Sequence, residues 1–198
     1  MTVVDVMTDR IEMADDDDEW SLDRWFELIE RMVPEGIKAE VVEGAVHMVP
    51  QRNVHWQLIR RVLYALDDRY SRDALVMTDV RIDFPGHQNG FCPDLAKLKD
   101  GAKPDEAGHW RHQDVEFIAE VISRGTGLND YGPKKTAYAE ADVPVYLIVD
   151  PYQGRCHVYT DPKDGEYRTE SKSDFGDEIN LTGTVVDLVL KTDAFPRD

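Results

Sequence analysis

The chain has 198 residues, of which 41% are hydrophobic, and this composition excludes a wholly disordered protein. No apolar run approaches the ~20 residues of a membrane span. The net charge is −17, and eleven acidic residues against two basic ones fall within residues 1–30, so any nucleic-acid function needs a local basic patch or a bound cation. Only two cysteines, Cys92 and Cys156, and no signal-peptide pattern argue against a disulfide framework, and we expect a soluble cytoplasmic protein with no membrane contact.

The chain begins with an acidic segment. Residues 1–19 end in Asp15-Asp16-Asp17-Asp18-Glu19, and like charges at this density repel one another and bury no apolar surface. We therefore predict a disordered acidic tail over residues 1–19, followed by a single domain over residues 20–198.

The first part of that domain predicts two helices around a β-hairpin. Ser21 can cap the first helix, and Glu43-Gly44 suits a tight turn between the strands. The second helix has one apolar stripe, and Arg60, Arg61 and Arg69 on its other faces are the nearest approach to a basic patch. The expected elements are a helix over 22–32, strands over 39–42 and 45–49, and a helix over 54–70.

The remainder predicts strands, one short helix and a polar loop over 99–113. Pro133 suits the first turn of the helix, and Asp164-Gly165 suits a hairpin turn. A single helix between strands 115–122 and 144–150 indicates a parallel crossover. The expected strands are 75–84, 91–98, 115–122, 144–150, 155–160, 166–172 and 184–190, with the helix over 133–141.

Two carboxylates fall on apolar strand faces. Glu120 lies between Ile118 and Ile122 on one face of its strand, and Asp94 shares a face with Cys92. A buried carboxylate is costly unless it is paired, protonated or bound to a metal. If the two strands are neighbours, a divalent cation between the acids removes the cost, and oxygen ligands favour Mg²⁺ or Mn²⁺. The alternative is that both acids are strand-edge residues paired with arginines.

Six short motifs, in this order and spacing, resemble the Uma2 family of bacterial restriction endonuclease-like proteins, within the PD-(D/E)XK nuclease superfamily. The resemblance covers about residues 20–160. It implies an α/β (α+β) fold with a restriction endonuclease-like mixed central sheet flanked by helices, and acidic residues converging at one end. The motifs are Glu40-Val-Val-Glu-Gly44, His55 opening a helix, Pro93-Asp94-Leu95-Ala96, Ile118-Ala-Glu120-Val-Ile-Ser123, Asp130-x-x-x-Lys134-x-x-x-Tyr138-Ala139, and Val143-Pro-Val-Tyr-Leu-Ile-Val-Asp-Pro151.

The resemblance also implies a site. Asp94 and Glu120 match the two acids of the superfamily motif, and Glu40 matches an early acid that completes the metal shell, so these three are the implied Mg²⁺ (or Mn²⁺) ligands. The superfamily lysine would stand two residues after Glu120, where this chain has Ile122. Lys134, on the next helix, is the family's replacement and the third implied catalytic residue, with Asp94 and Glu120. The alternative for Lys134 is a solvated surface lysine.

Further residues have supporting roles. Arg60 and Arg61 are candidate substrate-binding residues that hold backbone phosphates. His55 and Asp130 match family positions and form a second tier. A capping or core role for His55 is the alternative, and Asp130 is expected to fix the loop before Lys134.

These observations predict a Mg²⁺-dependent endonuclease that hydrolyses phosphodiester bonds, with DNA favoured over RNA as the substrate. A catalytically silent nuclease-fold module for interaction or regulation is the alternative, favoured by Ile122 and by a net charge of −8 outside residues 1–30. A third hypothesis is that the acidic tail mimics nucleic acid and occupies the groove. A homodimer is the default expectation for an oligomer.

Overall fold

The computed structural model describes residues 20–34, 37–50 and 52–198. The predicted acidic tail lies outside these residues. Within them, no helix is long and apolar enough to cross a membrane. The helices are α1 (Leu22–Met32), α2 (Asn53–Tyr70), the 3₁₀ turn η1 (His112–Asp114), α3 (Gly127–Tyr131) and α4 (Pro133–Glu140).

The strands form a six-stranded sheet, a five-stranded sheet and a two-stranded ribbon. The six-stranded sheet has the order β11-β10-β9-β8-β6-β3 and is mixed, because β8 and β9 are parallel and its other pairs are antiparallel. Its strands are β3 (Val76–Met77), β6 (Leu95–Leu98), β8 (Val115–Val121), β9 (Val145–Asp150), β10 (Arg155–Lys163) and β11 (Glu166–Asp174). The predicted parallel crossover is confirmed: α3 and α4 connect β8 to β9.

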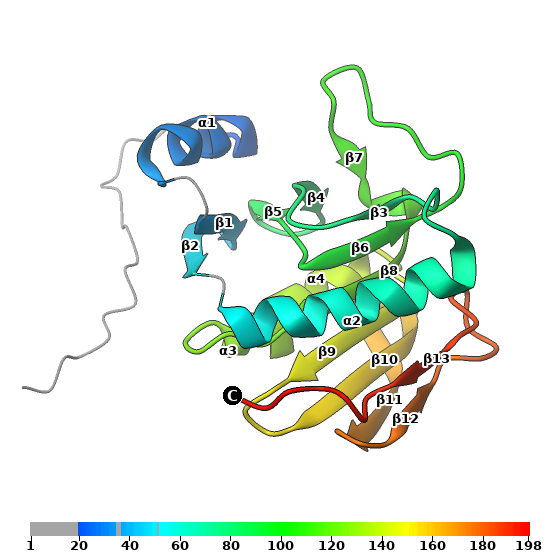
Figure 1. Cartoon of the computed structure of the whole chain (residues 1–198). Coiled ribbons are helices and arrows are strands. Elements are labelled where there is room, and N and C mark those ends of the chain that lie inside the picture. Colours follow the sequence, from blue (N-terminus) through cyan, green and yellow to red (C-terminus); the bar gives the residue numbers. More distant parts are fainter. Residues whose placement is uncertain (1–19, 35–36, 51) are drawn as a thin grey trace, which may run out of the picture.

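The five-stranded sheet has the order β2-β1-β5-β4-β7 and lies beside the six-stranded sheet, with α1 over it (Figure 1). Its strands are β1 (Ile37–Val42), β2 (Ala45–Pro50), β4 (Ile82–Phe84), β5 (Asn89–Phe91) and β7 (Trp110–Arg111). Glu43 and Gly44 both have positive φ, as the predicted tight turn between β1 and β2 requires. The ribbon pairs β12 (Glu178–Asn180) with β13 (Val189–Lys191) near α2.

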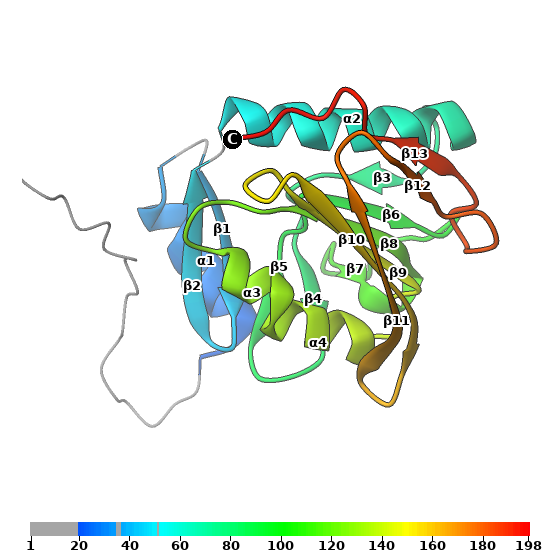
Figure 2. The same cartoon turned by 90° about the horizontal axis from the view of Figure 1, so that it is seen from below.

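The core fills both faces of the six-stranded sheet. α2 covers one face, where Leu58 and Leu66 belong to the same buried cluster as Phe117 and Leu147. α4 lies on the other face, where Tyr138 packs edge-on against Tyr146. Figure 2 shows the sheet between α2 on one side and α3 and α4 on the other. Near-complete burial of the central strands accounts for their continuous apolar sequences.

Two predicted strands are wrong as single elements, because each passes from one sheet to the other. The predicted strand 75–84 is split into β3 and β4, with Asp79 at φ +56° between them. The predicted strand 91–98 is split at Cys92–Asp94 into β5 and β6, where Pro93 has no N–H to donate to a ladder. The second split sets Asp94 at the junction of the two sheets.

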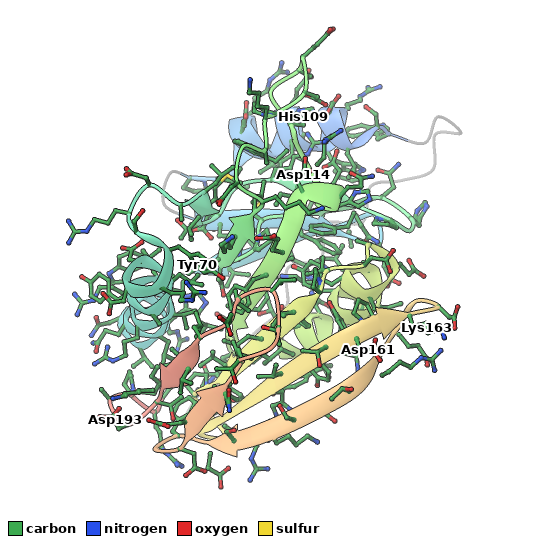
Figure 3. The ribbon with its side chains drawn as sticks, turned by 90° about the vertical axis from the view of Figure 1, so that its right-hand side faces the viewer. Tyr70, His109, Asp114, Asp161, Lys163 and Asp193 are labelled. Carbon is green, nitrogen blue, oxygen red and sulfur yellow. The ribbon has the colours of Figure 1, made fainter. Side chains whose placement is uncertain are left out.

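The other differences lie at the edges. The loop over 99–113 contains β7 and the start of η1, and α3 was not predicted. The predicted strand 184–190 is wrong over most of its length, because a turn with Asp187 at φ +41° precedes β13 and the partner β12 lies at 178–180. Figure 3 shows Asp161 and Lys163 near the turn of the β10–β11 hairpin, and His109 in the loop before β7.

Candidate active site

The three predicted metal ligands come from three separate segments and meet where the two sheets join. Glu40 lies in β1, Asp94 directly precedes β6, and Glu120 is the penultimate residue of β8; they are 3%, 3% and 1% exposed. The Asp94 N–H donates to Glu120 Oε2 at 3.2 Å, and the Val121 N–H donates to Asp94 Oδ2 at 2.8 Å. These two bonds continue the β6–β8 pairing and hold the two acids side by side.

Lys134 joins this group from the first turn of α4. Its Nζ lies 2.7 Å from Glu120 Oε1, 3.1 Å from both Glu40 carboxylate oxygens and 3.2 Å from Asp130 Oδ1. The side chain is 1% exposed, so the alternative of a solvated surface lysine is wrong. Pro133 at the first helical position sets where α4 begins and therefore where Lys134 enters the site.

Lys38 is a fifth member that the sequence reasoning missed. Its Nζ lies 2.6 Å from Asp94 Oδ1 and 3.8 Å from Glu120 Oε2. Lys38 stands two residues before Glu40, so both side chains project from the same face of β1. The signal was present in this alternation, but the strand was predicted to begin at residue 39.

Both second-tier residues contact the site. His55, in the first turn of α2, has Nε2 at 3.1 Å from Asp94 Oδ2, and its buried Nδ1 has no hydrogen-bond partner among the described residues. Asp130, in α3, contacts Lys134 through its side chain, and its carbonyl oxygen accepts a hydrogen bond from the Tyr146 hydroxyl at 3.0 Å. Asp130 thus links the loop before α4 to the sheet. His55 contacts a carboxylate and does not cap α2, whose N-cap is Arg52.

The environment separates the pKa values of the carboxyl groups. Burial alone would raise the pKa of Asp94, but the Lys38 ammonium and the hydrogen bond with His55 outweigh burial and hold that pKa below its ordinary value. Burial raises the pKa of Glu120 although Lys134 and Lys38 oppose the shift. Burial raises the pKa of Asp130 to about 8, with the negative charges of Glu120 and Glu40 adding to the effect against Lys134.

The two lysines stay charged in this setting. Burial would lower the pKa of Lys134, but Glu120 and Glu40 outweigh it and raise that pKa well above the ordinary value. The same balance, with Asp94 as the main opposing charge, raises the pKa of Lys38. The site therefore holds two ammonium groups among four carboxyl groups, and the raised pKa of Asp130, about 8, brings the titration of that carboxyl group close to neutral pH.

The carboxylate oxygens of the site are of the kind that binds a hard divalent cation, although Lys38 and Lys134 now contact these oxygens. Across the described residues, no group of three or more His, Cys, Asp or Glu side chains is set out to hold a metal ion. Glu40, Asp94 and Glu120 nevertheless offer only oxygen donors, which suit Mg²⁺. The Lys38 ammonium stands in for a cation between Asp94 and Glu120. The cavity among these side chains has a volume of about 10 Å³, which is room for about one water molecule.

The predicted arginines do not join the site. Arg60 is exposed on α2, with its guanidinium 5.6 Å from the Tyr64 ring centroid, and Arg61 donates to the carbonyl oxygen of Gln57. Their predicted role in holding substrate phosphates stays a prediction. The alternative that Asp94 and Glu120 are paired with arginines is wrong, because their cationic partners are lysines and His55.

A groove of about 410 Å³ lies between α1 and β1. Phe26 and Ile29 of α1 form one wall, and Lys38, Asp79 and Cys92 line the other side. Lys38 also lines the small inner cavity. It is therefore the residue that separates the groove from the buried acids.

The chain is similar to a family of proteins and to a solved structure, both described as putative nucleases. The model of the Uma2 family, described as "Putative restriction endonuclease", matches residues 25–193. A crystal structure of "a putative nuclease belonging to DUF820" from Anabaena variabilis superposes with a TM-score of 0.68 at 14% identity, covering 89% of this chain and 97% of that chain. This likeness confirms the predicted mixed-sheet, nuclease-like fold. The search of curated proteins gives no match.

Proposed function

Because the chain belongs to the Uma2 family, we propose that it is a Mg²⁺-dependent endonuclease that hydrolyses phosphodiester bonds in DNA. The family assignment rests on a match that spans residues 25–193 and agrees with the resemblance expected from the sequence motifs. The substrate and the metal are our proposals.

One observation carries the proposal: Glu40, Asp94 and Glu120 converge, almost fully buried, beside an open groove. Gathering three carboxyl groups away from water lowers the stability of the folded protein unless cations compensate. Such a costly arrangement favours a role in chemistry over a role in packing. The groove gives a polymeric substrate a route to the site.

In this proposal Glu40, Asp94 and Glu120 would hold the Mg²⁺, and Mn²⁺ would be the substitute. When bound, the metal polarises the scissile phosphate and lowers the pKa of a water molecule. The protein's own contribution is to orient the ligands. His55 fixes Asp94 through Oδ2, and the Tyr138 hydroxyl donates to Glu120 Oε1 at 2.7 Å.

Lys134 serves as a positioning residue in this mechanism. Its ammonium is enclosed by Glu40, Glu120 and Asp130, so it acts on the substrate through the carboxylates that it contacts. The added positive charge also offsets the negative charge that develops on the phosphate during attack. Arg60, which is exposed on α2, and the half-buried Arg61 beside it are proposed to hold DNA backbone phosphates away from the reacting atoms.

The catalytically silent module is the second candidate, and two features favour it. Lys38 already neutralises Asp94 and Glu120 without a metal, and Ile122 packs into the core where the superfamily has its lysine. A protein of this kind would keep the fold and bind nucleic acid or another partner without cleaving it.

Plasmid nicking in Mg²⁺ tests the proposal. We expect the wild-type protein to convert supercoiled DNA to open circles, and Asp94→Asn and Glu120→Gln to lose this activity by at least about 100-fold, because each removes a metal-ligand charge. Glu116→Gln is the matched control, since Glu116 pairs with Lys97 outside the site and its loss leaves the ligands intact.

Two results would count against the enzyme. Equal nicking by Asp94→Asn, Glu120→Gln and wild type would assign the activity to a contaminant or to another site. Binding of Mg²⁺ by calorimetry with no cleavage of varied DNA or RNA would support the silent module instead.

A further inference from the structure

We propose that Lys38 and the divalent cation compete for the same carboxylate oxygens, and that cation binding moves the Lys38 ammonium outward to Asp79 in the groove. This inference rests on the proposed metal site and concerns how that site opens. It makes Lys38 a positioning residue with two alternative anchors.

The first step of the argument is the set of atoms that Lys38 occupies. Its Nζ lies 2.6 Å from Asp94 Oδ1 and 3.8 Å from Glu120 Oε2, between the two acids. These are the oxygens that would bind a cation shared by the two carboxylates. An ammonium and a hard metal ion seek the same partners, so both cannot hold this position together.

The second step is that the opposite oxygens of both acids are already engaged. Asp94 Oδ2 accepts the Val121 N–H and contacts His55 Nε2. Glu120 Oε1 accepts the Tyr138 hydroxyl and contacts the Lys134 ammonium. Glu120 Oε2 accepts the Asp94 N–H at 3.2 Å and also faces Lys38, so Asp94 Oδ1 and Glu120 Oε2 are the oxygens that a cation would have to share with Lys38.

The third step is that Lys38 has a place to go. Its long flexible stem allows the ammonium to swing. Lys38 lines the outer groove of about 410 Å³ as well as the inner cavity, and its Nζ is already paired with Asp79 Oδ1 at 3.6 Å, so an outward movement shortens a contact that exists while it breaks the contact with Asp94. The Asp79 side chain is 36% exposed, against 4% for Asp94, so the alternative anchor is on the solvent side.

Lys134 lacks this freedom. It lies among Glu40, Glu120 and Asp130 within 3.2 Å of each, and it is 1% exposed. The two lysines thus divide the work: Lys134 holds the ligands, and Lys38 vacates the cation position. Once moved outward, the Lys38 ammonium faces the groove in which a substrate phosphate would lie.

Isothermal titration calorimetry with Mg²⁺ tests the competition on the full-length, EDTA-treated protein. If Lys38 leaves the site open in only about one molecule in ten, its removal raises the apparent affinity by the reciprocal of that open fraction, so we expect Lys38→Met to bind Mg²⁺ about tenfold more tightly than wild type. Asp79→Asn should bind more weakly than wild type, because the outward anchor is lost.

Lys97→Met is the matched control for the charge and burial removed. Lys97 is also buried and lies 2.6 Å from one carboxylate oxygen, of Glu116. Its ammonium lies over the ring of Tyr70, which Figure 3 labels near the end of α2. Tyr70 is 15 residues after His55 in the same helix, about 22 Å along the helix axis, so Lys97 lies far from the proposed metal ligands. Its Mg²⁺ affinity should equal that of wild type. Asp94→Asn lacks one proposed metal ligand but keeps the acidic residues 1–19. The heat released when Mg²⁺ is titrated into this variant therefore measures cation binding elsewhere on the chain.

The outcomes separate this inference from the proposed function. Equal or weaker Mg²⁺ binding by folded Lys38→Met overturns the competition, and Lys38→Gln replaces it if circular dichroism shows that the methionine variant is unfolded. Absence of Mg²⁺ binding in every variant overturns both the competition and the metal site. Competition without nicking by any variant supports the inference and removes the nuclease function.

Discussion

At the scale of single residues, the Lys134 ammonium compensates the buried negative charge of Glu40 and Glu120. Lys134→Met leaves Glu40 and Glu120 without this partner, and removing one side of a buried ion pair costs about 3–5 kcal/mol. We expect a loss of that size in the free energy of unfolding, measured by urea denaturation in metal-free buffer.

Lys135→Met is the control for this change, since Lys135 is the next residue of α4 and half-buried. Its Nζ lies 5.1 Å from the Tyr159 ring centroid, and losing such a contact costs about 1 kcal/mol or less. Equal losses of unfolding free energy in Lys134→Met and Lys135→Met would mean that the ion pairs of Lys134 add no more to stability than the ring contact of Lys135.

Asp130 gives the site a pH dependence whose sign follows from its raised pKa. The carboxyl group titrates near its ordinary value of 3.8 in the unfolded chain and at about 8 in the folded protein. Between these values the folded state binds more protons, so this group's contribution to stability is full below about pH 4 and falls as the pH rises toward 8.

Asp130→Asn isolates that contribution, because asparagine has the same shape and does not titrate. The free energy of unfolding of wild type minus that of Asp130→Asn should decrease between pH 5 and pH 8, as measured by urea unfolding at several pH values. A difference that is flat or increases with pH would show that Asp130 is ionised across this range.

Residue by residue, the sequence predicted the acids better than their partners. Glu120 and Asp94 stood out because a carboxylate on an apolar strand face requires a compensating group. Lys134 was placed on the correct helix, but its enclosure by three carboxylates depends on how α4 packs, which no local pattern encodes. Lys38 was missed because the predicted strand began one residue too late.

At the scale of elements, α1 lies over β5 at a glycine. A Cβ at Gly90 would stand 2.6 Å from Phe26 Cε2 and 3.2 Å from Leu22 Cδ2, so Gly90→Ala must displace the Phe26 ring from its present position. Overpacking of this kind costs about 1–3 kcal/mol. We expect that loss in urea denaturation, together with a change in the groove that Phe26 lines.

A double-mutant cycle assigns the cost to this contact. In a Phe26→Ala background the added methyl group has space, so Gly90→Ala should cost less there than in wild type. The same cost in both backgrounds would place the strain elsewhere in β5.

Helices and strands whose hydrophobic residues recur with a clear helical or strand period were predicted from the sequence. Segments in which the chain passes from one sheet to the other were not. α1, α2 and α4, the β1–β2 and β10–β11 hairpins and the parallel crossover all follow from local patterns and turn residues. The chain changes sheets near Asp79, which has positive φ, and near Pro93, and an alternating pattern looks the same whichever sheet a strand joins. Asp94 owes its place in the site to this exchange.

At the scale of the whole molecule, charge opposes the proposed substrate. The net charge is −17, and residues 1–19 contribute eight acidic residues and one basic residue to it. A chain that lacks these residues carries −10, so its repulsion of the DNA backbone is weaker. We therefore expect deletion of residues 1–19 to raise DNA affinity severalfold at low salt.

Fluorescence anisotropy with a labelled duplex in EDTA measures this affinity without cleavage. The gain should shrink as salt is raised, because a Debye length of about 8 Å at physiological ionic strength screens exposed charges. A full-length variant with Asp15–Asp18 changed to Asn and Glu19 to Gln keeps the chain length and removes five of the charges. It should reproduce most of the gain if charge is the cause, whereas unchanged affinity in both proteins would show that the acidic segment does not oppose DNA binding.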